Sequence, residues 1–140
     1  MVVIVGKNPH QERKARTLCE GMPQARVLGW VDNMQDWMAA ADLLVSKPGG
    51  ATLAEAFACG LPMLAFDPLP GNERRTCQWI EKWGGGLWVR RPEDLAVNIE
   101  RLLDHRDELR RLQEQVRALA RPRAAYEAAQ AILKLCKTGN

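Results

Sequence analysis

Ser46-Lys-Pro-Gly-Gly-Ala-Thr-Leu-Ala-Glu-Ala-Phe-Ala-Cys-Gly60 is the stretch of sequence that decides the predicted fold. The apolar run 42–46 that leads into it has the length and branching of a strand buried on both faces. Residues 48–50 then turn the chain, and the alanine-rich residues 51–59 predict a helix that stops at Gly60. Because a helix that starts above a strand end presents free N–H groups and a positive dipole end, this segment predicts a phosphate site.

Glu55 is the one acid in this predicted helix. It lies four residues after Ala51 and three after Thr52, so the three side chains share a helix face. Helical side chains lean toward the N-terminus, and we therefore expect a buried carboxylate in the same crevice. Its two oxygens can accept both hydroxyls of a ribose 2′,3′-diol while a phosphate occupies the helix end. A glutamate that emerges at the helix edge into solvent is the alternative.

The length and composition of the chain set its class. With 140 residues we predict a single domain over 1–140, in which 105–140 form a C-terminal helical segment. Hydrophobic residues at 46% and charged residues at 26% are typical of soluble globular proteins. No apolar run approaches the roughly 20 residues needed to span a bilayer, and residues 1–5 are too short for a secretory signal. These observations predict a cytoplasmic protein.

Charge and ligand spacing exclude several functions. The net charge is only +3, and the arginine-rich stretch 90–123 is interleaved with acids, which predicts a solvated helical face and no nucleic-acid partner. Contact with an anionic membrane surface stays open. His10 and His105 lie outside any cluster, and the four cysteines form no C-x-x-C pair, so neither a metal site nor a redox dithiol is predicted.

Strand and helix patterns alternate along the chain. The predicted strands are 2–6, 25–28, 42–46, 62–66 and 87–89; the predicted helices are 11–20, a short one capped by Asn33, 51–59, 73–83, two between 94 and 121, and 126–135. This order predicts an α/β fold, a parallel sheet with helices on both faces. Because the first strand has almost no lead-in, we also expect structure upstream of it.

Ligands of such sheets bind at the carboxyl ends of the strands. That rule gathers four glycine-bearing loops at one edge, namely 6–8, 29–31, 46–50 and 67–72. An NAD-type dinucleotide domain is a further alternative, but no G-x-G-x-x-G follows the first strand.

The loops and their flanks resemble one family. The matching segments are Gly29-Trp-Val, Asn33-Met34, Asp42-Leu-Leu-Val-Ser-Lys-Pro-Gly-Gly, Thr52-Leu-Ala-Glu-Ala, Gly60-Leu-Pro and Pro70-Gly-Asn-Glu73. Over residues 2–103 the sequence resembles the C-terminal, donor-binding half of the monogalactosyldiacylglycerol synthase and diacylglycerol glucosyltransferase family. The peptidoglycan N-acetylglucosaminyltransferase is similar more distantly. The resemblance implies a Rossmann-like domain, one half of a GT-B glycosyltransferase that transfers a sugar from UDP with inversion.

The resemblance also implies roles for individual residues. The helix start would hold the diphosphate, Glu55 the ribose, the Trp30-Val31 backbone the uracil edge, and the loop before the fourth helix the sugar. The implied UDP-sugar contacts are Gly6, Lys7, Trp30, Val31, Pro48, Gly49, Gly50, Ala51, Thr52, Glu55, Asn72, Glu73, Arg75 and Thr76. Thr76 departs from the family, in which this position is usually Asn or Gln, so the identity of the sugar stays open.

The family places its general base and its acceptor surface in an N-terminal domain that this sequence does not match. We therefore expect no catalytic residue, metal or separate cofactor in this chain, and we expect it to bind a UDP-sugar without turning it over. The expected enzyme glycosylates a lipid such as diacylglycerol, with peripheral contact at the cytoplasmic membrane surface. The alternative is a naturally separate UDP-sugar-binding subunit that needs a membrane-associated partner chain.

Two further groups of side chains leave alternatives open. Arg74 and Arg75 fall in the first turn of the helix 73–83, where cations oppose the helix dipole. They either pair with acids or contact a phosphate or an anionic lipid surface. Trp79, Trp83 and Trp88 are expected in the core because such rings supply large apolar area. An exposed patch that meets another domain or a membrane is the alternative.

Overall fold

A computed structural model describes residues 1–138 of the chain. The chain divides into two compact units, Met1–Asp36 and Trp37–Asn140, and each is described by itself. The prediction of one domain over 1–140 therefore stays a prediction.

The first unit is built on two parallel strands. β1 (Val2–Ile4) pairs with β2 (Arg26–Leu28), and α1 (Pro9–Leu18) connects them. α1 begins at Asn8, whose side-chain oxygen accepts hydrogen bonds from the backbone N–H groups of His10 at 3.0 Å and Gln11 at 3.2 Å. α2 (Met34–Ala39) follows and spans the division between the units.

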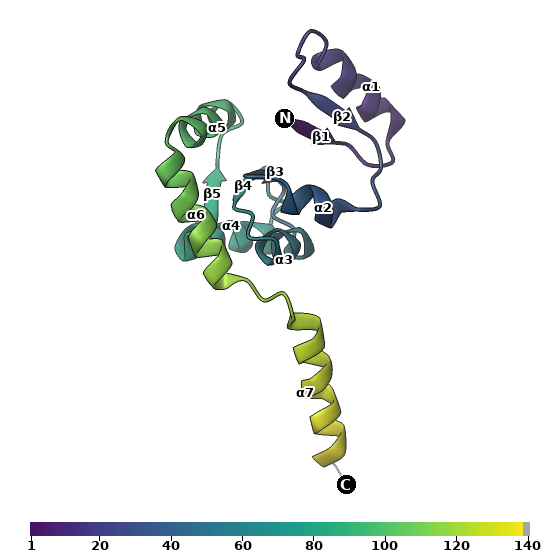
Figure 1. Cartoon of the computed structure of the whole chain (residues 1–140), viewed down its shortest axis with the longest axis vertical. Helices are drawn as coiled ribbons and strands as arrows, with labels where there is room; N and C mark the ends of the chain where they lie inside the picture. The colour runs from purple at the N-terminus through teal and green to yellow at the C-terminus, as the bar shows by residue number, and fades with distance from the viewer. Residues whose placement is uncertain (139–140) are drawn as a thin grey trace. The chain divides into compact units, whose positions relative to one another are not determined.

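The second unit contains a three-stranded parallel sheet in the order β3-β4-β5 (Figure 1). The strands are β3 (Leu44–Ser46), β4 (Met63–Phe66) and β5 (Gly86–Val89), joined by α3 (Gly50–Ala58) and α4 (Asn72–Trp83). Three further helices follow within the described residues: α5 (Asp94–Asp104), α6 (Arg106–Leu119) and α7 (Ala124–Thr138). Parallel strands joined by helices confirm the predicted α/β class.

Both faces of this sheet are covered. Leu64 and Val89 pack with Leu102 of α5, and these buried side chains are surrounded by further apolar residues: Leu43, Val45, Phe66, Leu87, Leu95, Ile99 and Leu112. α4 covers the other face. At Gly86 of β5 an added Cβ would collide with the Met63 carbonyl of the neighbouring strand β4 and would crowd Ile80 of α4. Glycine there allows the close packing of sheet and helix.

Two expectations are corrected. The five strands form two sheets within the described chain rather than one, because no hydrogen-bonded ladder joins β1 or β2 to β3–β5. Trp79 and Trp83 are 48% and 44% exposed rather than core residues, because α4 buries Cys77 and Ile80 from its opposite side.

Candidate functional site

The N-terminus of α3 lies directly beyond the carboxyl end of β3. Its capping residue Gly49 is extended, at φ −63° and ψ 141°, and has no side chain that could accept a hydrogen bond from the helix N–H groups. Leu53 makes the first helical hydrogen bond, from its N–H to the Gly49 carbonyl at 2.9 Å. The N–H groups of Gly50, Ala51 and Thr52 precede it, and no hydrogen bond of theirs is formed within the described chain. Three free donors at a positive helix end favour an anion.

The space above this helix end is open. A Cβ built on Gly50 would meet no atom within 4 Å, and one on Gly49 would approach only the Thr52 hydroxyl, at 3.7 Å. Pro48 is buried beneath the turn, and it fixes the backbone that leads into the helix. A ligand phosphate can therefore approach the backbone of this turn without displacing a side chain.

Glu55 lies on the exposed side of α3. The expectation of a buried acid is wrong: Leu53, Ala56 and Phe57 occupy the buried positions of this helix, and Glu55 points away from them. Its carboxylate forms no hydrogen bond or ion pair with another described residue. A free carboxylate one turn beyond the phosphate donors can accept hydrogen bonds from a ligand, as the ribose hypothesis requires.

The loops after β3 and β4 meet at the same edge of the sheet. Lys47 Nζ lies 2.9 Å from Asp67 Oδ2 and so joins the two loops. The hydrogen bond and the charge of Asp67 raise the pKa of Lys47, which therefore keeps its positive charge beside the predicted phosphate position. The adjacency of these two loops was expected from the rule that parallel strands end at one edge.

The loop 67–71 is held in place by the start of α4. Asp67 has a positive φ of 45° and Gly71, the capping residue of α4, has φ 97°. Glu73 Oε2 accepts a hydrogen bond from the Leu69 N–H at 2.7 Å. One carboxylate oxygen of Glu73 thus fixes the loop, and Asn72 beside it is exposed.

The two remaining predicted residues of α4 lie differently. Arg75 is exposed, whereas Thr76 is only 8% exposed and donates its hydroxyl to the Asn72 carbonyl at 3.1 Å. The Thr76 hydroxyl can still accept one hydrogen bond, but its proton is already used. Next to it, burial raises the pKa of Cys77 to about 11, so this thiol stays protonated and is no nucleophile at neutral pH.

A surface pocket of about 440 Å³ opens at the carboxyl ends of β4 and β5. Its walls come from both strand ends and from α4: Phe66, Asp67, Pro68, Arg74, Trp88, Val89, Arg90 and Pro92. Arg74, which the resemblance does not assign, therefore faces the pocket, while Arg75 does not line it. Neither arginine has an ion pair in the described part of the chain, so the interpretation as paired surface arginines is not supported. The signal in the sequence that could have indicated Arg74 as a pocket residue was the pair of arginines in the first turn of this helix.

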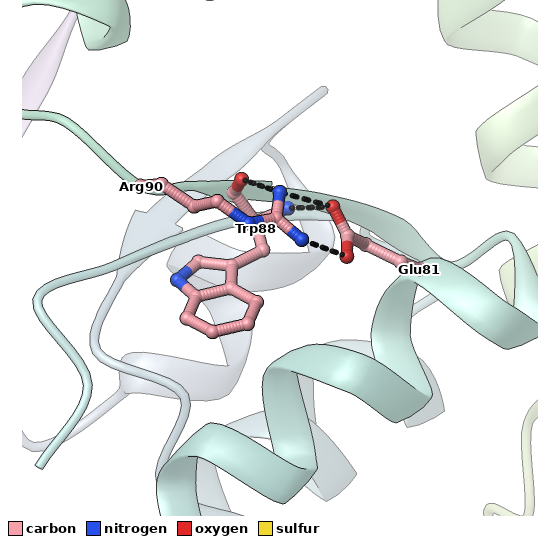
Figure 2. A network of polar contacts seen from close by, with 3 residues as sticks. All are labelled: Glu81, Trp88 and Arg90. Carbon is pink, nitrogen blue, oxygen red and sulfur yellow. Dashed lines mark hydrogen bonds and ion pairs between the residues drawn. The ribbon is translucent and has the colours of Figure 1, made fainter. Parts of the chain in front are cut away.

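Glu81 organises one wall of this pocket, as Figure 2 shows. Its two oxygens accept from the guanidinium fork of Arg90 at 3.1 and 2.9 Å, and Oε1 also accepts from the Trp88 N–H at 3.4 Å. The Arg90 guanidinium lies over the Trp88 ring, 4.4 Å from its centroid. The hydrogen bonds that Arg90 donates to Glu81 raise the pKa of Arg90 and tie α4 to β5.

Replacing Glu81 with alanine should lower the free energy of unfolding by about 1 kcal/mol, because it leaves a charged fork and a strand N–H without their acceptor in a partly solvated site. Urea denaturation measures the change. The matched control is Arg91→Ala, which removes an ion pair with Asp94 in which the arginine side chain is 68% exposed, and which should cost less than about 0.5 kcal/mol. Equal losses in the two variants would show that the Glu81 fork has no special role.

The predicted contacts in the first unit form a group of their own. The end of β1 and the end of β2 are joined by the Val5 N–H, which donates to the Leu28 carbonyl at 3.0 Å. Gly6 adopts φ 71°, and Lys7 Nζ lies 4.2 Å above the centroid of the Trp30 ring. Two loops that the sequence placed at one edge thus meet.

Trp30 and Val31 leave their backbone groups available. The Trp30 ring is 59% exposed and its Nε1 donates to Asp32 Oδ1 at 2.6 Å. The backbone N–H and C=O groups of Trp30 and Val31 form no hydrogen bond within residues 1–138. Unpaired backbone groups at a strand end can read the edge of a base.

Two negative findings concern the described residues alone. No three His, Cys, Asp or Glu side chains among them gather as metal ligands. None of the helices formed by residues 1–138 is long and apolar enough to cross a bilayer.

Comparison with models of protein families shows the family of this chain. The model of the family described as glycosyl transferases group 1 matches residues 1–105. The chain belongs to this family. Its match covers the whole first unit, the second unit as far as residue 105, and every residue of the predicted donor site; it ends where α5 gives way to α6.

Two relatives show which enzymes of this family the chain is similar to. The chain is 30% identical over 120 residues to a processive diacylglycerol beta-glucosyltransferase of Bacillus pumilus, covering 85% of this chain and 31% of the relative. It is 31% identical over 130 residues to the chloroplastic monogalactosyldiacylglycerol synthase 3 of Arabidopsis thaliana, covering 91% of this chain and 27% of the relative. The resemblance drawn from the sequence is confirmed. The chain spans about a third of the length of these relatives.

A solved structure confirms the fold. MurG of Acinetobacter baumannii aligns with a TM-score of 0.78 at 20% identity, covering 96% of this chain and 41% of that one. The chain therefore has the Rossmann-like α/β fold of one half of a GT-B glycosyltransferase.

Proposed function

We propose that this chain is the UDP-sugar-binding half of an inverting hexosyltransferase that glycosylates a lipid acceptor such as diacylglycerol. One observation carries the proposal: α3 begins with three N–H groups that have no acceptor within residues 1–138, beneath open space at Gly50, and one turn later it presents Glu55, whose carboxylate has no partner among the same residues. Phosphate donors followed by a diol acceptor match the order of groups in a nucleoside diphosphate.

In this proposal the helix end binds the diphosphate. The N–H groups of Gly50, Ala51 and Thr52 and the Thr52 hydroxyl donate to phosphate oxygens, and Lys47 adds a positive charge held by Asp67. Glu55 accepts both ribose hydroxyls. We expect no metal ion in this binding mode, because the helix N–H groups and the Thr52 hydroxyl donate directly to the phosphate oxygens.

The remaining predicted residues complete the donor site. Asn72 and the second oxygen of Glu73 contact sugar hydroxyls, with Arg75 and Thr76 nearby. The free backbone groups of Trp30 and Val31 recognise the uracil edge, and Gly6 and Lys7 border the phosphates. Arg74 joins this set as a residue of the pocket beside the sugar position.

The acceptor is proposed from the relatives. The curated names of both describe enzymes of diacylglycerol glycolipids, a glucosyltransferase and a galactolipid synthase. We extend the lipid acceptor of these two relatives to this protein. The alternative is a naturally separate subunit that presents the UDP-sugar to a membrane-associated partner chain with the acceptor site.

The 140-residue chain should bind UDP-glucose or UDP-galactose without transferring the sugar, because the proposal assigns the general base and acceptor surface to another domain or chain. Incubation with radiolabelled donor and diacylglycerol vesicles, followed by lipid extraction, measures transfer. The control is the same mixture with a full-length diacylglycerol glucosyltransferase. Glycolipid formation by the purified chain alone would contradict the assignment of the general base and the acceptor surface to another domain or chain.

A further inference from the structure

One side of α4 presents two tryptophans and two cations to solvent. Arg75, Gln78, Trp79, Lys82 and Trp83 follow one another at helical spacing, and all five are exposed. We name these residues the outer face of α4. The Trp79 and Trp83 rings stack with centroids 5.7 Å apart and an interplanar angle of 17°. The exposed apolar area of this face is therefore continuous.

The opposite side of α4 explains why the outer face stays free. Thr76, Cys77 and Ile80 are buried against the sheet and hold the helix in one orientation. The two acids of α4 are also directed elsewhere: Glu73 binds the Leu69 N–H and Glu81 binds Arg90. The outer face consequently contains Arg75 and Lys82 as its only charged residues.

This combination has a specific physical preference. Tryptophan has an apolar ring and one N–H, and it is enriched at the headgroup level of membranes. Lysine and arginine next to it are attracted to anionic headgroups and can extend their charged ends toward them. The centre of a protein interface is enriched in tryptophan and arginine but depleted of lysine. The charge of the outer face thus complements an anionic lipid surface better than it fits a protein partner.

We propose that the outer face of α4 binds the surface of bilayers that contain anionic phospholipids. The inference goes beyond the proposed function, which concerns the donor, and rests on it only in that a lipid acceptor requires the enzyme to work at a membrane. Trp79 and Trp83 enter the headgroup region while Lys82 contacts phosphates of the lipid surface. The pocket at the ends of β4 and β5 begins one turn earlier on the same helix, at Arg74.

Vesicle flotation with the 140-residue chain tests the proposal. Wild type should bind vesicles of equal parts phosphatidylglycerol and phosphatidylcholine, bind pure phosphatidylcholine weakly, and lose affinity in about 1 M salt. The double variant Trp79→Ala/Trp83→Ala and the single variant Lys82→Glu should each weaken binding by about tenfold or more. Arg75 is left unchanged because it belongs to the proposed donor site.

Two matched controls distinguish binding through the outer face of α4 from non-specific binding of the protein to vesicles. Lys14→Glu makes the same charge change at an exposed position of α1, and Tyr126→Ala removes a 56% exposed aromatic ring from α7. Both should bind vesicles within about twofold of wild type. UDP affinity of all variants, measured by calorimetry, should equal that of wild type, which keeps failure of this proposal distinct from failure of the donor site.

Three results would overturn the proposal. The first is vesicle binding that the Trp79/Trp83 and Lys82 variants leave unchanged. The second is an equal loss in the control variants. The third is absence of wild-type binding together with a wild-type dimer that the double tryptophan variant converts to monomer, because the face would then join two copies of the chain.

Discussion

Replacing Gly50 with valine should weaken UDP binding at least about a hundredfold, an energy of roughly 2.7 kcal/mol, while the fold stays intact. A side chain at this position points into open space, since its Cβ would meet no atom within 4 Å. Valine is also no worse than glycine in a helix, so α3 should not be destabilised. The two added methyl groups would instead occupy the position where the helix N–H groups meet the phosphate.

Titration calorimetry with UDP and a thermal melt of the same sample measure both quantities. The control is Ala54→Val, which adds a valine to the exposed side of the same helix one turn further on. It should bind UDP as wild type does. A Gly50→Val protein that melts normally and binds UDP with unchanged affinity would show that the α3 N-terminus is not the phosphate site.

Replacing Glu55 with alanine should weaken UDP binding by about tenfold to hundredfold, because hydrogen bonds to a charged acceptor contribute roughly 1.5–3 kcal/mol. The carboxylate is exposed and unpaired within the described chain, so its removal disturbs no internal contact. Stability should therefore stay within about 0.5 kcal/mol of wild type.

A thermodynamic cycle assigns the lost energy to the ribose. Wild type should bind 2′-deoxy-UDP about tenfold more weakly than UDP, whereas Glu55→Ala should bind the two nucleotides equally. Glu114→Ala, at an exposed acid of α6, is the control and should keep the wild-type preference. If Glu55→Ala still distinguished the two nucleotides as strongly as wild type, the carboxylate would not contact the 2′-hydroxyl.

Local sequence patterns predicted the elements of the fold well. The strand before Pro48 and the helix that stops at Gly60 follow from β-branched residues, glycine turns and alanine spacing, which act within a few residues. The meeting of the loops at Lys47 and Asp67 followed from a topological rule that also needs no distant contact.

Features that depend on distant packing escaped prediction. Trp79 and Trp83 were predicted to lie in the core because large aromatic rings favour burial. Only one side of their helix is buried, however, and Cys77 and Ile80 occupy that side. The pairing of Glu81 with Arg90 joins residues nine positions apart on different elements, and no short-range spacing indicates it.

The surroundings of the predicted site residues could not be read from the sequence. The exposure of Glu55 could not be read from its helix face alone, since helical periodicity fixes which residues share a side and not what covers that side. The inclusion of Arg74 in the pocket required the position of β5 beside α4.

The central claim is that this chain holds a uridine diphosphate, and a calorimetric comparison of UDP, ADP and GDP with the wild-type chain tests it most directly. UDP should bind at least about tenfold more tightly than either purine nucleotide, because a purine would leave the backbone groups of Trp30 and Val31 without matching partners, a cost of roughly 1–3 kcal/mol. Equal affinity for the three nucleotides, or binding of none, would contradict the account.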